Sequence, residues 1–127
     1  YMDGFQVAKG AGPWDDCALT VLATVVSRPT GNRAIIDAGS KTLSSDTFGM
    51  EGFGRVVEYP DAVISSLSEE HGTIDLTSCT ENPKVADRIR IIPNHACVVS
   101  NLFDSVILIS DESVVEIAPV AARGRVD

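Results

Sequence analysis

Features that would indicate a membrane protein, an exported protein or a nucleic-acid-binding protein are missing from these 127 residues. No apolar run approaches the roughly 18 residues that cross a bilayer, and no charged and then apolar N-terminal stretch marks a signal peptide. Basic residues are few and scattered, 10 against 18 acidic ones, so a surface that follows a phosphate backbone is not expected. We therefore expect a cytoplasmic protein that binds neither a membrane nor nucleic acid.

Cysteine is also scarce. The three cysteines, Cys17, Cys79 and Cys97, have no CxxC spacing, and an odd number cannot all pair within one chain. Free thiols in a reducing compartment are therefore expected, and a disulfide framework is not. Several catalytic signatures are absent as well: there is no Ser-His-Asp order, no Walker loop and no dinucleotide-binding glycine fingerprint.

Long amphipathic helices are not predicted, because no segment keeps a helical period for more than about three turns. The chain instead has short runs rich in β-branched residues, separated by Gly, Pro, Asn and Asp. These runs cover residues 18–28, 33–37, 55–59, 62–67, 88–92, 105–109 and 114–118. The first two predict a hairpin. The whole pattern predicts one all-β domain over residues 1–127, with few short helices, built as a β-barrel or a sandwich-like sheet.

The opening of the chain, residues 1–16, is rich in glycine and is expected to be irregular, without a helix or strand of its own. Such an abrupt start is typical of a domain cut from a larger protein, although a frayed natural terminus would look the same.

The strongest local signal for chemistry is Pro93-Asn94-His95-Ala96-Cys97, which follows the predicted strand ending at Ile92. In an extended chain, residues i and i+2 point to the same side, so the imidazole and the thiolate can converge on one point. This pair suits a borderline-soft ion, above all zinc. Two protein ligands would leave coordination positions for water or substrate. The alternative is a packed cysteine and a hydrogen-bonded histidine.

Two further segments are candidates for lining a site. Glu70 and His71 follow a predicted strand, and a carboxylate beside a histidine can orient its ring; the alternative is an exposed polar turn. Residues 37–46 offer hydroxyls and backbone N–H groups to an anion, without the glycine spacing of a phosphate loop. Lys41 lies in this run. Nothing near it indicates the desolvation that a Schiff-base lysine needs, so we expect a surface residue.

Four stretches, taken in order, resemble the C-terminal domain of D-serine dehydratase-like and D-threonine aldolase-like enzymes. They are CALTVLATVVSRP (17–29), AIIDAGSKTLSSD (34–46), ISSLSEEHG (64–72) and IIPNHACVVSNLFD (91–104). The resemblance extends from about Cys17 to Arg125, and several motifs in the right order are more specific than any one of them.

The resemblance implies an architecture of the alanine racemase type. An N-terminal barrel holds pyridoxal phosphate (PLP) on a lysine, and a C-terminal β-domain closes the site, usually in a homodimer. His95 and Cys97 are then the ligands of a divalent metal beside the cofactor, and the cysteine favours zinc and dehydratase chemistry over aldolase chemistry. Glu70 and His71 would line the entrance to the active site, and the substrate would be a 3-hydroxy-D-amino acid.

These residues contain no PLP barrel and no cofactor lysine, so the chain alone is not expected to run the reaction and is expected to be a fragment of a larger enzyme. Two other functions stay open. A non-catalytic β-domain for binding or oligomerisation would bury Cys97 and would not respond to zinc. A domain of a metal-independent amino-acid racemase would keep the fold and make His95 dispensable.

Overall fold

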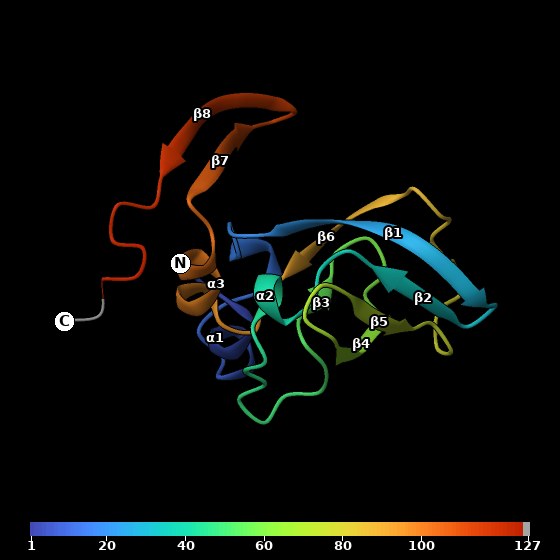
Figure 1. Ribbon diagram of the computed structural model, residues 1–127. Coiled ribbons are helices and arrows are strands. Elements are labelled where there is room, and N and C mark those ends of the chain that lie inside the picture. Colours follow the sequence, from blue (N-terminus) through green and yellow to red (C-terminus); the bar gives the residue numbers. More distant parts are fainter. Residues whose placement is uncertain (126–127) are drawn as a thin grey trace.

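Six antiparallel strands close into a barrel at the centre of the fold. In the computed structural model, which describes residues 1–125, their order around the barrel is β1-β2-β5-β4-β3-β6 (Figure 1). The strands are β1 (Val21–Thr30), β2 (Arg33–Ile36), β3 (Arg55–Val56), β4 (Val63–Leu67), β5 (Gly72–Asp75) and β6 (Arg88–Ile92). The predicted all-β class is confirmed, and of the two arrangements left open the barrel is the one observed.

The long strand β1 closes the barrel because it pairs with two neighbours along its length. Its first half pairs with β6, with Val21 opposite Ile91. Its second half pairs with β2, with Val25 opposite Ile36, and the register shifts beyond this point. Shifts of this kind bend a strand and increase its twist, which lets one strand join both sides of the barrel. The predicted hairpin of the first two runs is confirmed by the pairing of β1 with β2.

Aliphatic side chains fill the barrel. Ile89 and Ile91 of β6 are 1% and 0% exposed, whereas Arg88 and Arg90 are exposed. This is the alternation of a strand with one buried face. Burying one isoleucine side chain contributes about 1.5–3 kcal/mol. The other large, fully buried aliphatic side chains are Val25, Ile36, Val56, Ile64, Ile74 and Val99.

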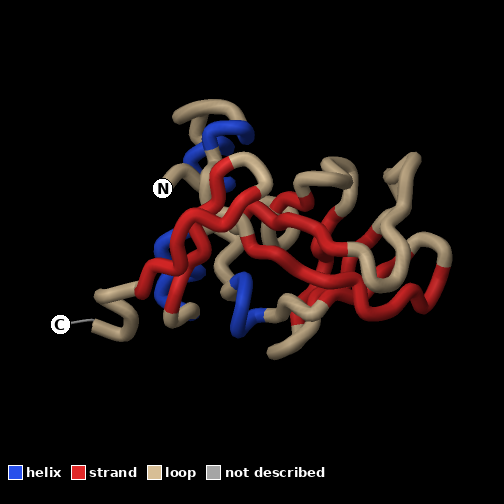
Figure 2. Tube along the Cα trace, turned by 90° about the horizontal axis from the view of Figure 1, so that it is seen from above, coloured by secondary structure: helices blue, strands red, loops and turns tan. Residues whose placement is uncertain are grey.

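Three short helices lie toward one end of the barrel (Figure 1), and Figure 2 shows them from above as separate blue segments on that side of the molecule. They are α1 (Gly4–Ala8), α2 (Ser40–Leu43) and α3 (Ala96–Leu102), and a 3₁₀ turn covers Trp14–Asp16. Within residues 1–125, every helix is too short to cross a bilayer.

The expectation of an irregular opening is wrong, because residues 1–16 hold both α1 and the 3₁₀ turn. The N–H groups of Gly4 and Phe5 donate to the carbonyl oxygens of Pro93 and Asn94, each at 3.0 Å. A helix of five residues is too short to be stable alone, so tertiary hydrogen bonds of this kind keep it folded.

The last two predicted strands form a separate hairpin that stands away from the barrel (Figure 1). It consists of β7 (Ser105–Ser110) and β8 (Ser113–Pro119). Its pairing places Ile107 opposite Ile117 and Ile109 opposite Val114, so these four side chains share one face. They are 61–64% exposed, and we call them the aliphatic face of the hairpin.

Candidate metal site

His95 lies at the junction between β6 and α3. The strand ends at Ile92, and His95 is the last extended residue (φ −134°, ψ 105°) before the helix begins at Ala96. Cys97 is therefore the second residue of a helix, and the expectation of an extended chain through Cys97 is wrong. The imidazole and the thiol are presented by the start of a helix and not by one face of a strand.

A buried carboxylate explains why the helix starts there. Asp3 is 4% exposed; its Oδ2 accepts a hydrogen bond from the N–H of Ala96 at 2.9 Å and its Oδ1 one from the N–H of Gln6 at 3.1 Å. One carboxylate thus satisfies N–H groups in the first turns of α3 and α1, where negative charge is favoured. The sequence reasoning missed Asp3. The signal that could have found it is the glutamine three residues after it, as in a capping box.

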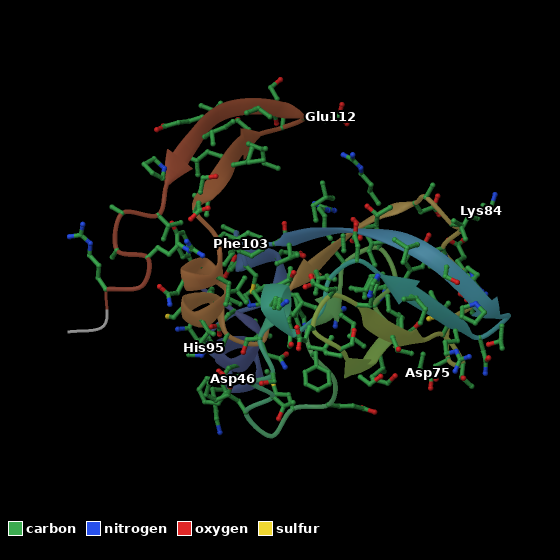
Figure 3. The ribbon with its side chains drawn as sticks, viewed as in Figure 1. Asp46, Asp75, Lys84, His95, Phe103 and Glu112 are labelled. Carbon is green, nitrogen blue, oxygen red and sulfur yellow. The ribbon has the colours of Figure 1, made fainter. Side chains whose placement is uncertain are left out.

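The ring of His95 is partly enclosed. Its side chain is 30% exposed, and the nearest acidic atom to Nδ1 is Oδ2 of Asp46 at 3.8 Å. The ring of Phe48 packs against it edge to face, with 4.8 Å between centroids. Figure 3 shows Asp46 and His95 close together at the helical end, far from Asp75 and Lys84 at the other end of the barrel.

Among residues 1–125, Nδ1 of His95 is the buried side-chain atom that has no hydrogen-bond partner. Buried polar atoms are nearly always paired, so such an exception needs an explanation. The ring of His95 thus lies next to the Asp46 carboxylate, at a distance too long for a hydrogen bond.

Cys97 is the accessible thiol of the chain. All three cysteines are free; Cys17 is buried, Cys79 is half-buried and Cys97 is exposed. Burial, with smaller contributions from neighbouring aspartates, raises the pKa of the Cys17 and Cys79 thiols. The alternative to a metal site was a packed cysteine at position 97, and this is not observed because Cys97 is exposed.

The residues present fit a partial metal site. A neutral imidazole and a thiolate are ordinary zinc ligands, and both side chains are at least partly accessible. The described part of the chain has no group of three or more His, Cys, Asp or Glu side chains that could enclose an ion. An ion held by His95 and Cys97 would therefore keep open positions for water, substrate or a ligand from elsewhere.

Glu70 and His71 lie in the exposed turn between β4 and β5. Nζ of Lys41 is 2.6 Å from Oε1 of Glu70 and 2.9 Å from Oε2 of Glu69. The hydrogen bond with Glu70 raises the pKa of Lys41, and the same bond lowers the pKa of Glu70. In the part of the chain that the structure describes, no hydrogen bond or ion pair links this turn to His95 or Cys97.

A covalent PLP site does not fit the lysines of this chain. Lys41 is a surface residue, as predicted, with its side chain 59% exposed and paired with two carboxylates. Lys9 and Lys84 are exposed too. A Schiff-base lysine needs a desolvated amine with a lowered pKa, so the described residues have no candidate.

Comparison with known proteins places the chain in a family. The family described as "Putative serine dehydratase domain" matches residues 18–109. An uncharacterized protein of Mycobacterium tuberculosis is 41% identical over 97% of this chain and 96% of its own length. A D-threonine aldolase of Arthrobacter sp. is 31% identical over 98% of this chain, which covers 32% of that enzyme. The chain thus spans about a third of the length of that aldolase.

Solved structures share the fold. The D-threonine aldolase from Filomicrobium marinum matches with a TM-score of 0.86 and 29% identity, over 100% of this chain and 35% of the aldolase. The D-threo-3-hydroxyaspartate dehydratase from Delftia sp. HT23 matches with a TM-score of 0.82 and 28% identity, over 94% of this chain and 36% of the dehydratase. Two variants of that dehydratase carry alanine in place of a histidine and of a cysteine two positions later, and the cysteine variant is in a metal-free form.

The barrel and its helices therefore have counterparts in larger enzymes. This chain belongs to the D-serine dehydratase-like family and has the β-domain that forms the C-terminal part of D-threonine aldolase-like and alanine racemase-like proteins.

Proposed function

We propose that this chain is the metal-carrying C-terminal domain of a PLP-dependent lyase that acts on 3-hydroxy-D-amino acids, of the D-serine dehydratase or D-threonine aldolase type. The observation that carries the proposal is the pair His95 and Cys97, which combines an exposed thiol with a partly exposed imidazole at the junction between β6 and α3. A histidine and a cysteine with the same spacing are the residues replaced in the Delftia dehydratase variants, one of which is metal-free.

In this proposal His95 and Cys97 hold a divalent ion, and their nitrogen and sulfur atoms favour zinc. If His95 and Cys97 held such an ion, it would supply a Lewis acid able to stabilise negative charge on the substrate β-hydroxyl oxygen. The residues of this chain would bind the ion and fix the orientation of its ligands. The end of β6 and the start of α3 hold His95 from both sides, and Asp3 fixes the first residue of the helix.

The remaining machinery comes from outside these residues. The PLP-binding barrel would be supplied by another part of the polypeptide or by another chain, and this chain alone would be inactive. We further propose that the complete enzyme is a cytoplasmic homodimer with a small D-amino acid as its substrate, and that Glu70 and His71 line the entrance to its site.

Zinc calorimetry on the 127-residue chain tests the proposal. We expect binding near one equivalent, weakened in both His95→Ala and Cys97→Ala. The matched control is His71→Ala, because His71 is the only other histidine of the sequence and is exposed. Lack of binding by the unaltered chain, or equal binding by all four proteins, would contradict a metal-carrying role.

In the racemase alternative, His95→Ala would leave the activity of the complete enzyme unchanged.

The hairpin favours one other function, a module for self-association. A two-stranded hairpin is marginally stable by itself, and its aliphatic face is exposed and uncharged. We propose a second copy of the chain as its occupant, because two such faces can pack without opposing like charges despite the net charge of −8. Sedimentation should then show a dimer that Ile109→Glu dissociates. A monomer at all concentrations would contradict this function.

A further inference from the structure

The loop that follows α2 forms one wall around the ring of His95. It contributes Asp46, whose Oδ2 is 3.8 Å from the buried Nδ1, and Phe48, which packs edge to face on the ring. Phe48 also contacts Phe5 of α1, with 4.9 Å between ring centroids. The ring of Phe48 therefore packs against both the ring of His95 and the ring of Phe5, which are distant in the sequence.

The position of Asp46 is fixed by the residue that precedes the histidine. Asn94 is 5% exposed, and its Nδ2 donates to the carbonyl oxygens of Asp46 at 3.3 Å and of Gly52 at 2.9 Å. The N–H of Asp46 donates to Oγ of Ser44 at 3.1 Å. Because Asn94 and His95 are adjacent, these bonds tie the backbone of Asp46 to the backbone of His95, and the carboxylate stays next to the ring.

The chemistry of the pair determines which ring nitrogen carries the proton. A neutral imidazole has one N–H donor and one lone pair, and an ionised carboxylate only accepts hydrogen bonds. The carboxylate of Asp46 therefore favours the tautomer with the proton on Nδ1, which leaves the lone pair on Nε2. Histidines that bind metals commonly donate their other N–H to a carboxylate, which orients the ring and increases its basicity.

We propose that Asp46 is a positioning residue for His95: it accepts a hydrogen bond from Nδ1 and so directs the lone pair of Nε2 to a divalent cation. The role of the cation rests on the proposed function, whereas the choice of tautomer does not need it. A distance of 3.8 Å is too long for a hydrogen bond. The side chain of Asp46 is 46% exposed, so a small rotation of this side chain can bring its carboxylate within hydrogen-bonding distance of Nδ1.

The tautomer can be read directly by nitrogen-15 NMR of the imidazole in the metal-free chain at alkaline pH, where imidazole side chains are neutral. The unaltered chain should show a protonated Nδ1 at His95, and Asp46→Ala should shift the population toward a protonated Nε2. Glu51→Ala is the matched control, because Glu51 is an exposed acid of the same loop, and it should leave the tautomer unchanged. A protonated Nε2 in the unaltered chain, or no change in Asp46→Ala, would overturn the inference.

Zinc affinity gives the second measurement. Asp46→Ala should weaken zinc binding by about 10–100-fold, the usual effect of losing a residue that orients a metal ligand, while Glu51→Ala should bind as the unaltered chain does. Full affinity in Asp46→Ala would overturn the inference. If the unaltered chain shows the expected tautomer but binds no zinc, the proposed function is contradicted while the assignment of Asp46 to the histidine ring is supported.

Discussion

At the scale of single residues, the three thiols differ in environment and should differ in reactivity. Cys97 is exposed, whereas burial and nearby aspartates raise the pKa of Cys17 and Cys79. The thiolate is the reactive form, so a raised pKa lowers its fraction at neutral pH. We expect iodoacetamide to modify Cys97 first, and the other two to follow only as the pH is raised.

Peptide mass spectrometry measures this order, with Cys97→Ala as the chain that should stay almost unmodified at neutral pH. Zinc should protect Cys97 if the ion binds there. Modification of Cys17 at the same rate as Cys97 would contradict the burial of Cys17.

Asp3 should contribute to stability out of proportion to its place near the chain end. Asp3→Ala leaves the N–H groups of Gln6 and Ala96 without their partner, and an unsatisfied buried donor costs about 1–3 kcal/mol. Urea unfolding should show a loss of this size. Asp15→Ala removes an exposed acid nearby and should change the free energy of unfolding by less than about 0.5 kcal/mol. Equal effects would disprove the capping role.

At the scale of elements, the contact between α2 and the β4–β5 turn depends on a glycine. The N–H groups of Ser40 and Lys41 donate to the carbonyl oxygens of Ser68 and Glu69 at 2.9 and 3.1 Å. A Cβ at Gly39 would lie 2.4 Å from the carbonyl oxygen of Glu69, which is backbone and cannot rotate away.

Gly39→Ala should therefore displace the turn and cost about 1–3 kcal/mol, as overpacking does. Thermal unfolding checks the stability, and amide NMR shifts of residues 68–71 check the displacement. Gly31→Ala is the control, because a Cβ there meets open space. An unchanged turn in Gly39→Ala would show that the two elements are not tightly packed.

The elements that sequence reasoning missed are those whose stability comes from neighbours. β5 (Gly72–Asp75) has only four residues and begins with a glycine and ends with an aspartate, yet it pairs with β2 on one side and β4 on the other. α1 and α3 are short, and Asp3 caps them both. A short stretch of sequence does not show which distant residues will stabilise it. Arg88–Ile92 was predictable because the alternation of arginine and isoleucine lies within the strand itself.

At the scale of the whole molecule, the barrel should account for most of the free energy of unfolding, and the β7–β8 hairpin for little of it. Ile91 is 0% exposed within the barrel and Ile109 is 62% exposed on the hairpin. The same substitution at both positions separates the two parts. Ile91→Ala should cost about 2–5 kcal/mol of unfolding free energy, and Ile109→Ala less than about 0.5 kcal/mol, measured by denaturant titration of the monomer. Similar losses of unfolding free energy in the two variants would mean that the hairpin packs against the barrel.

The sequence by itself determined the all-β class, most strands and the pairing of the first two, because periodicity and turn residues act over a few positions. It also singled out His95 and Cys97, since two ligand-type side chains lie close along the chain. Only the tertiary structure decided that the strands close into a barrel, that α3 begins between these two residues, and that Asp46 stands beside the imidazole. The reason is physical: these features depend on hydrogen bonds and packing between segments tens of residues apart, such as Asp3 with Ala96 and Asn94 with Asp46.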